Sequence, residues 1–511
     1  MKRNSWFQWF FCGVISIGIL TFQPAAHAAN ASNQACESRA NDTTEKLLEC
    51  INSQSLWQHL AFFQKISDAN PGSDGHGNRD TGTKGYSDSV KYVATLMKQA
   101  GYQVTVQAYP YRFSEVTGTP QFSSGNRNYA LGTEWFVARL SGGGTMSARI
   151  QPAGEGCAPE AFKNFTPGNI ALLERSTCSY DTQVKNASRA GAAAVILYNN
   201  IGTLRGWGED SLAAAHARGD GGAFQARLTR AVTIPVISSS YKVGADLQNQ
   251  YAAGNAPVVH LDIRTQTKSG TDYNLIAESP YGDPNHTVII EGHLDAIFGA
   301  GMLDNASGST TIMEIALKLA KTPTTNRLRY IWFGGEELGL LGSAYYTQHL
   351  SSSELAILAF DLDADVTATP NYDYLVADPA NASNVNQFPP NVVPQSRIGN
   401  EFFADFFRQQ GVPVAPAWFG NDGTDSNSFS LVGIPNTGIL TEQDCCKSQQ
   451  EVNVWGGYLG NYEGQVPGNN GGCVDYPDRW CDNLSNNDPA VFDLASKATA
   501  YVTFKLANHA F

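Results

Sequence analysis

The run Val288-Ile289-Ile290-Glu291-Gly292-His293-Leu294-Asp295 opens the stretch that decides the fold, and this stretch continues to residue 365. Two further runs, at 330–333 and 355–360, are also short and apolar, and polar residues follow each of them closely. Such runs predict buried strands. Between the first two, residues 312–319 repeat apolar side chains at helical spacing. This alternation predicts an α/β fold with a mostly parallel central sheet flanked by helices.

Acidic side chains and one imidazole follow the predicted strands, where sheets of this kind bind their ligands. They are His293, Asp304, Glu336, Glu337 and Asp363. Carboxylates held close together repel one another, and a divalent cation removes that penalty. Imidazole and carboxylates without cysteine suit a catalytic zinc site with an open position. In the adjacent pair Glu336-Glu337, one carboxylate can bind the metal while the other accepts a proton. The alternative is that these acids are simply exposed to solvent at the strand ends. This explanation fits any one of the residues alone better than it fits all five together.

These motifs resemble peptidase family M28, the zinc aminopeptidases of the bacterial leucine aminopeptidase type. The matching segments are 293–295, 304–308, 336–343 and 362–363. The resemblance implies two zinc ions that share Asp304. It gives the remaining residues these roles: His293 and Asp363 bind the first zinc, Glu337 binds the second, Glu336 is the general base, and Asp295 orients His293.

One zinc ligand of the family, a late His, has no counterpart here, because no His lies between Asp363 and His509. The matching segment is 473–484. In it, Asp478 precedes Asp482 at the family's spacing, and we expect Asp478 to replace the His as a metal ligand. Asp475, counted forward from Cys473, is the alternative. The family's Tyr before this His is Pro477 here, with Tyr476 as the nearest candidate for its role.

Residues 1–28 have the pattern of a secretory signal peptide, with Lys2 and Arg3, an apolar core at 10–22 and a small-residue cleavage site at 26–28. The core is too short to span a bilayer. We therefore expect a secreted or periplasmic protein that leaves the membrane once the signal is removed. Without that segment, 32 basic residues stand against 47 acidic ones, a net charge of −15. This charge disfavours nucleic acid and anionic membranes as partners.

The eight cysteines that follow the predicted signal peptide agree with an oxidising compartment. Proximity in the chain suggests three pairs, which are Cys36–Cys50, Cys157–Cys178 and Cys473–Cys481. Cys445 and Cys446 would then remain as an adjacent pair. No cysteine has the spacing of a zinc finger.

The chain divides at a change of pattern near residue 118. Residues 29–117 form an N-terminal segment and the start of the catalytic domain, and residues 265–511 continue that domain. Between them, 118–264 is rich in predicted strands and in glycine, and its helix-turn-strand unit at 185–198 resembles a protease-associated (PA) domain. Such an insertion would be a lid or a substrate-steering wall, or else an inert elaboration. The first residues, 29–70, are either a structural lead-in or a removable pro-segment.

Together these features predict metal-assisted hydrolysis of peptides. An acidic rim that includes Asp361, Asp363 and Asp365 would attract a substrate's free α-ammonium and favour an aminopeptidase. Two alternatives remain open. One is a glutaminyl cyclase, a relative with a single zinc that uses the late His this chain lacks. The other is a non-catalytic binding protein on the same scaffold. No motif specifies an assembly state.

Overall fold

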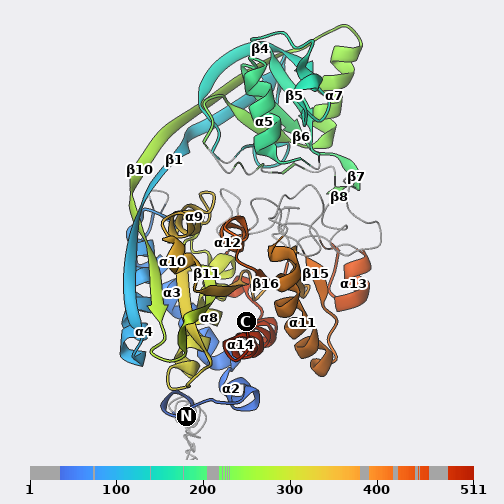
Figure 1. Cartoon of the computed structure of the whole chain (residues 1–511). Coiled ribbons are helices and arrows are strands. Elements are labelled where there is room, and N and C mark those ends of the chain that lie inside the picture. Colours follow the sequence, from blue (N-terminus) through green and yellow to red (C-terminus); the bar gives the residue numbers. More distant parts are fainter. Residues whose placement is uncertain are drawn as a thin grey trace, which may run out of the picture.

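The computed structural model describes residues 35–72, 75–138, 140–176, 178–203, 218–220, 223–224, 226, 228, 231–297, 299–379, 391–417, 424–442, 447, 449–459 and 482–511. Figure 1 shows a main body below and an insertion above, joined by two long strands that run along one side. We use "main body" for the described residues of 35–117 and 265–511, and "insertion" for those of 118–264.

Four parallel strands form the centre of the sheet in the main body, in the spatial order β16, β13, β11, β12. They are β11 (Asp283–His293), β12 (Asn326–Phe333), β13 (Leu358–Ala364) and β16 (Asn436–Leu440). The three strands expected between 287 and 365 are thus confirmed. Antiparallel strands flank this centre: β10 (Val258–Glu278) pairs with β12, and β14 (Leu375–Ala377) pairs with β16 and, in parallel, with β15 (Ala415–Ala417).

Both faces of the central strands are buried, which is why each of them contains a run of apolar residues. Successive residues of a strand point to opposite faces. Val288 and Ile290 of β11 join the larger core cluster, whereas Ile289 joins a second cluster with Tyr346 and Phe429. Helices supply much of the larger core: α3 (Ser53–Asp68), α4 (Lys84–Ala100), α8 (Gly308–Leu319), α11 (Val392–Gln410) and α14 (Pro489–Ala507).

Shorter elements complete the main body. The second cluster is covered by α9 (Leu341–Gln348) and α12 (Ser426–Leu431). The others are α2 (Thr44–Cys50), η2 (Met302–Ser307), α10 (Ser352–Leu355), α13 (Gln449–Trp455) and η4 (Leu484–Asn486). The apolar face of α4, formed by Val90, Val93, Ala94 and Met97, is buried.

The insertion is connected to the main body by β1 (Gln103–Ser124) and β10, which pair antiparallel along most of their lengths. The expected boundaries fall opposite each other on these strands, where Thr117 pairs with Arg264. Beyond them, β4 (Gly144–Pro152), β5 (Ile170–Glu174), β6 (Ala194–Tyr198) and β9 (Val236–Ser239) form a parallel sheet with α5 (Tyr180–Arg189) and α7 (Tyr241–Ala252). The remaining elements are β2 (Arg127–Asn128), β3 (Trp135–Val137), η1 (Pro159–Phe162), β7 (Ile201–Thr203) and β8 (Arg218–Asp220).

The described N-terminal residues are integrated into the main body. Leu56, Leu60 and Phe63 of α3 are completely buried in its larger core. Disulfides join Cys36 to Cys50 and Cys157 to Cys178, which confirms two of the expected pairs. The other cysteine pairs and the signal peptide lie outside the described residues. Across the described ranges, no helix has the length and apolar character needed to cross a bilayer.

Candidate metal centre

Three strand ends and one helical turn bring polar residues together at the carboxyl edge of the central sheet. His293 is the last residue of β11, Glu336 lies three residues after β12, and Asp365 directly follows β13. Asp304 lies in η2, which leads into α8. Because parallel strands end at the same edge of a sheet, residues that are far apart in the chain meet here.

The segment after Asp304 is tied to the end of β13 by its own polar side chains. Asn305 Nδ2 donates to the carbonyl of Ala364 (3.0 Å), and Asn305 Oδ1 accepts from the N–H of Val366 (3.2 Å). Asn305 therefore holds the chain on both sides of Asp365. Gly308 permits this close approach, because a Cβ there would collide with the carbonyl oxygen of Ala364. The Asp-Asn-x-Ser-Gly motif thus places Asp304 beside Asp365.

Two glycines shape the turn that carries Glu336. Gly335 has a φ of +68°, a conformation that favours glycine. A Cβ at Gly334 would collide with the hydroxyl of Tyr86, a buried residue of α4. The turn can therefore leave β12 sharply and pack against α4, which brings Glu336 back toward the end of β11.

The imidazole of His293 is the centre of the group. Its Nε2 lies 2.9 Å from Asp304 Oδ1, 3.4 Å from Asp365 Oδ1 and 4.0 Å from Glu336 Oε2. One ligand atom each from His293, Asp304 and Asp365 lies within 4.8 Å of the other two. Ligand atoms bound tetrahedrally at 2.0–2.1 Å from zinc are about 3.3 Å apart. The spacing and the donor chemistry of these three residues therefore fit a zinc ion.

Asp365, not Asp363, completes this group. Both side chains are on the same face of β13, since they are two positions apart. Asp363 lies within the strand, is 1% exposed, and its Oδ2 accepts a hydrogen bond from the hydroxyl of Thr424 (2.7 Å). Asp365 lies one residue beyond the strand end and reaches His293. The geometry therefore favours Asp365 over the expected Asp363 as the third metal ligand.

Asp295 is placed to orient both His293 and the Glu336 turn. Its main-chain oxygen lies 3.1 Å from His293 Nδ1, and its Oδ1 lies 3.6 Å from the same nitrogen. The Oδ1 atom also accepts from the N–H of Glu336 (3.3 Å), and Oδ2 accepts from the hydroxyl of Thr81 (2.9 Å). Ligating histidines usually have such a partner on the second ring nitrogen. These contacts support the role that the family resemblance implied for Asp295.

Burial and the repulsion between neighbouring carboxylates shift the pKa values of the site residues. Burial raises the pKa of Glu336 well above its ordinary value, although His293 opposes this, and the neighbouring Glu337 carboxylate raises it further. Burial would lower the pKa of His293, but the carboxylates of Glu336 and Asp365 raise it well above its ordinary value. So much negative charge in one buried place is unfavourable without a cation. A divalent ion would compensate it.

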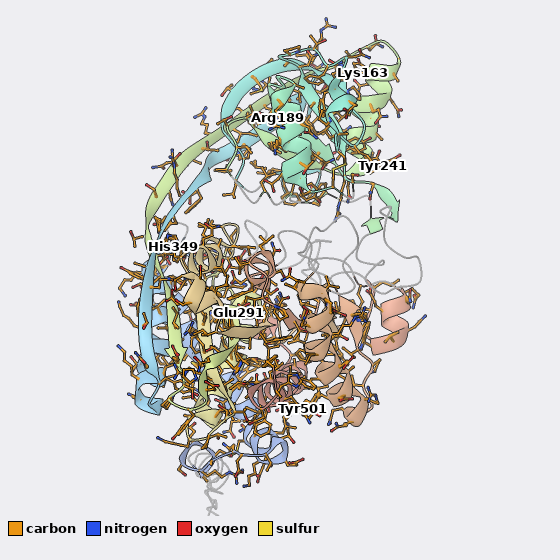
Figure 2. The ribbon with its side chains drawn as sticks, viewed as in Figure 1. Lys163, Arg189, Tyr241, Glu291, His349 and Tyr501 are labelled. Carbon is orange, nitrogen blue, oxygen red and sulfur yellow. A yellow bond between two sulfur atoms is a disulfide. The ribbon has the colours of Figure 1, made fainter. Side chains whose placement is uncertain are left out.

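The prediction that Asp361, Asp363 and Asp365 form an accessible acidic rim is wrong for the first two. Asp361 is fully buried and Asp363 is 1% exposed, so neither can meet a substrate at the surface. They lie next to Glu291, which is also fully buried and which Figure 2 places inside the main body. Burial raises the pKa values of Glu291 and Asp361 well above their ordinary values, and Asp363 raises both further. These three carboxyl groups form a layer beneath the site.

The remaining expected ligands are Glu337 and Asp478. Glu337 follows Glu336 in the same turn and is 2% exposed. Asp478, its alternative Asp475 and Tyr476 lie outside the described residues. Asp482 is described, and its carboxylate accepts from the N–H groups of Leu303 (2.7 Å) and Asp304 (3.2 Å). The end of the segment expected to supply the last ligand is therefore attached to the turn that carries Asp304.

Three residues of this region received no role from the sequence: Arg79, Thr81 and Thr424. Each acts through a hydrogen bond to a residue more than 60 positions away. No local pattern in the sequence predicts such contacts. Asp365 did carry a signal, because it is the last of three alternating acids and only the last can lie beyond the strand end.

Comparison with known proteins agrees with this site. Residues 274–503 match the model of peptidase family M28, and residues 145–247 match that of the PA domain. An aminopeptidase of Pseudomonas aeruginosa is 29% identical over 485 residues, which cover 89% of this chain and 81% of that protein. A probable leucine aminopeptidase 2 of Aspergillus oryzae is 29% identical over 449 residues, which cover 84% and 80% respectively.

Solved structures share the fold. An aminopeptidase from Aneurinibacillus sp. strain AM-1 superposes with a TM-score of 0.68 at 20% identity, covering 92% of this chain and 97% of that one. A zinc aminopeptidase from Bacillus subtilis superposes with a TM-score of 0.57 at 22% identity, covering 90% and 96%. The matched PA segment lies within the insertion, and the M28 segment contains every described residue of the metal group. The chain is therefore a metallopeptidase that matches family M28 over residues 274–503 and the PA domain over residues 145–247.

Proposed function

We propose that this protein is a secreted or periplasmic zinc aminopeptidase that removes N-terminal residues from peptides. The observation that carries the proposal is the grouping of His293, Asp304 and Asp365 within 4.8 Å, with the Glu336 carboxylate 4.0 Å from the imidazole. This arrangement combines a three-ligand metal site with an adjacent proton acceptor, as metal-assisted hydrolysis requires.

The ligands divide between two zinc ions. His293, Asp304 and Asp365 would hold the first ion, with Asp365 in the place first expected for Asp363. Asp304, Glu337 and Asp478 would hold the second, with Asp475 as the alternative to Asp478. Asp295 fixes the ring of His293 through contacts of 3.1 and 3.6 Å to Nδ1. The position of Asp482 against Asp304 supports a ligand from the segment that precedes it.

Bound zinc would polarise the scissile carbonyl and lower the pKa of a water held beside it. Glu336 accepts the proton of the attacking water and returns it to the departing amine. Its N–H is held by Asp295, which keeps its carboxylate beside His293. Burial, which raises the pKa of Glu336, prepares this residue to carry the proton between the two steps.

Exopeptidase action follows from the charge around the site and from the relatives. The free α-ammonium of a peptide is attracted to the acidic edge of the site, where Asp304, Glu336 and Asp365 keep some exposure. Relatives that cover most of this chain are named aminopeptidases. The position of the insertion suggests that it limits the access of substrates. The helices α9 and α12, which are close to site residues in the sequence, lie on the side of the main body that faces the insertion (Figure 1). We propose that the insertion forms a wall over the entry of substrates.

Export is supported by the two disulfides, since disulfides persist in oxidising compartments. The predicted signal peptide at 1–28 and the absence of a described membrane-spanning helix are compatible with it.

The test compares wild type with Glu336→Gln for zinc per chain and for hydrolysis of an aminoacyl 4-nitroanilide. Wild type should bind zinc and hydrolyse the free amine but not its N-acetylated form. Glu336→Gln should keep its zinc and lose about 10²–10⁴-fold in kcat. Glu278→Gln, which removes the charge of an acid bonded to Arg327 and Arg329, is the matched control. A wild-type protein with one zinc or none and no hydrolysis would point to a cyclase or a binding protein.

A further inference from the structure

Arg79 is a fully buried cation whose side chain, among the described residues, donates only to main-chain carbonyls. Its Nε donates to the carbonyl of Ala300 (2.7 Å), Nη1 to Leu294 (2.8 Å) and Nη2 to Gly301 (2.8 Å). Within the described part of the chain, no carboxylate forms a direct ion pair with it, although the charges of Asp482, Asp295 and Asp80 partly offset the effect of burial on its pKa. Burying a cation without a directly bonded carboxylate is costly, so stability alone gives little reason for an arginine here.

The three acceptors belong to one connection, which links His293 to Asp304. The main chain of Arg79 adds two bonds to this connection: its N–H donates to Gly299 (2.9 Å) and its carbonyl accepts from Ala296 (3.3 Å). The guanidinium also lies over the ring of Phe63, 5.2 Å from its centroid. A connection of this length would otherwise have considerable conformational freedom. The described residues of 294–301 thus form five hydrogen bonds with Arg79 alone.

The opposite end of the same connection is held by a residue of complementary chemistry. Arg79 binds carbonyl groups at 294, 300 and 301, whereas Asp482 accepts from the N–H groups of Leu303 and Asp304. Three carbonyl oxygens of this connection are therefore bound by a cation, and two N–H groups at its end are bound by an anion. With these contacts formed, His293 Nε2 and Asp304 Oδ1 are 2.9 Å apart.

We propose that Arg79 is a positioning residue of the metal centre, which holds the described residues of 294–301 in the metal-binding conformation and so determines how long zinc is retained. This rests on the proposed function, because zinc must bind at His293 and Asp304. Residues behind metal ligands commonly contribute 10–100-fold to metal affinity. Arg79 reaches the ligands through the main chain instead of through a ligand side chain.

The experiment measures the zinc dissociation constant and dissociation rate of the full chain by competition with a chelator. Arg79→Gln should bind zinc about 10–100-fold more weakly and release it faster, while excess zinc should restore most of its kcat. Arg79→Lys keeps the charge without the planar fork, so it should lie between Arg79→Gln and wild type. If Arg79→Gln does not fold, zinc release from Arg79→Lys tests the proposal.

Lys318→Gln is the control for the loss of a buried cation, because Lys318 is equally buried and pairs with Glu37 and Glu314 instead of the site. It should lower the Tm without changing zinc release. Wild-type zinc release in folded Arg79 variants, or equal acceleration by Lys318→Gln, would overturn the inference. A wild-type protein that binds no zinc would instead overturn the proposed function.

Discussion

Thr81 and Asp295, which are 214 positions apart in the chain, are joined by a hydrogen bond of 2.9 Å from the Thr81 hydroxyl to Asp295 Oδ2. The Thr81 oxygen also accepts from the N–H of Gly335 (3.0 Å). Through this one hydroxyl, the turn before α4 is connected to the partner of His293 and to the turn that carries Glu336. The N-terminal residues are thus part of the catalytic architecture.

Thr81→Val should impair catalysis without removing zinc. The substitution keeps the shape of the side chain but leaves Gly335 N–H and Asp295 Oδ2 unsatisfied, at a cost of about 1–3 kcal/mol. Because both groups adjoin Glu336, we expect kcat to fall about tenfold or more with zinc content unchanged. Thr81→Ser retains the hydroxyl and should keep near-wild-type kcat. Equal kcat in the valine and serine variants would show that the bond has no catalytic role.

Asp365→Asn and Asp363→Asn form a matched pair that identifies the third ligand. We expect Asp365→Asn to weaken zinc binding by more than about 100-fold, because it removes a charged ligand atom from the group around His293. Asp363→Asn should retain zinc, since its partner is the hydroxyl of Thr424. Zinc content after dialysis against a weak chelator distinguishes them. The reverse pattern would restore the assignment that sequence resemblance suggested.

Lys318→Met should destabilise the protein by about 3 kcal/mol. Lys318 and Glu314 are both fully buried and lie 3.1 Å apart, so the substitution removes the lysine charge and leaves the Glu314 carboxylate with His59, 3.5 Å away. Removing one partner of a buried pair is costly for this reason. The free energy of unfolding in urea measures the effect. Lys46→Met, which disrupts the exposed pair with Asp42, is the control and should cause no measurable loss.

Asp272→Asn should stabilise the protein at neutral and alkaline pH. Burial raises the pKa of Asp272 from 3.8 to about 7, although the N–H of Gly82, which donates to its Oδ2 (2.6 Å), opposes this. Folding therefore favours the protonated acid. Its contribution to stability is complete below pH 3.8 and is lost as the pH rises to about 7. Asparagine keeps an acceptor for Gly82 without the charge.

Thermal unfolding between pH 5 and pH 8 checks this prediction. The Tm of Asp272→Asn should exceed that of wild type by an amount that grows from pH 5 to about pH 7 and then levels off, with about 1.4 kcal/mol of linkage for each unit of pKa shift. A constant difference between the two proteins would show that Asp272 does not titrate in this way.

Local patterns in the sequence identified much of this molecule. Apolar runs predicted β11, β12 and β13 because a strand buried on both faces is rich in apolar residues. Helical spacing of apolar residues predicted α8. His293, Asp304 and Glu336 could be selected because they follow those strands, and ligands bind at such ends.

The sequence by itself thus determined the α/β architecture, the family motifs and the chemical types of the site residues, because these depend on neighbours within about one turn or strand. Only the tertiary structure decided which of Asp361, Asp363 and Asp365 reaches His293, since all three alternate on one face and differ only in distance from the strand end. It also revealed Arg79, Thr81 and Thr424, whose partners are distant in the chain. Their roles depend on where folding places those partners, and no local pattern encodes that position.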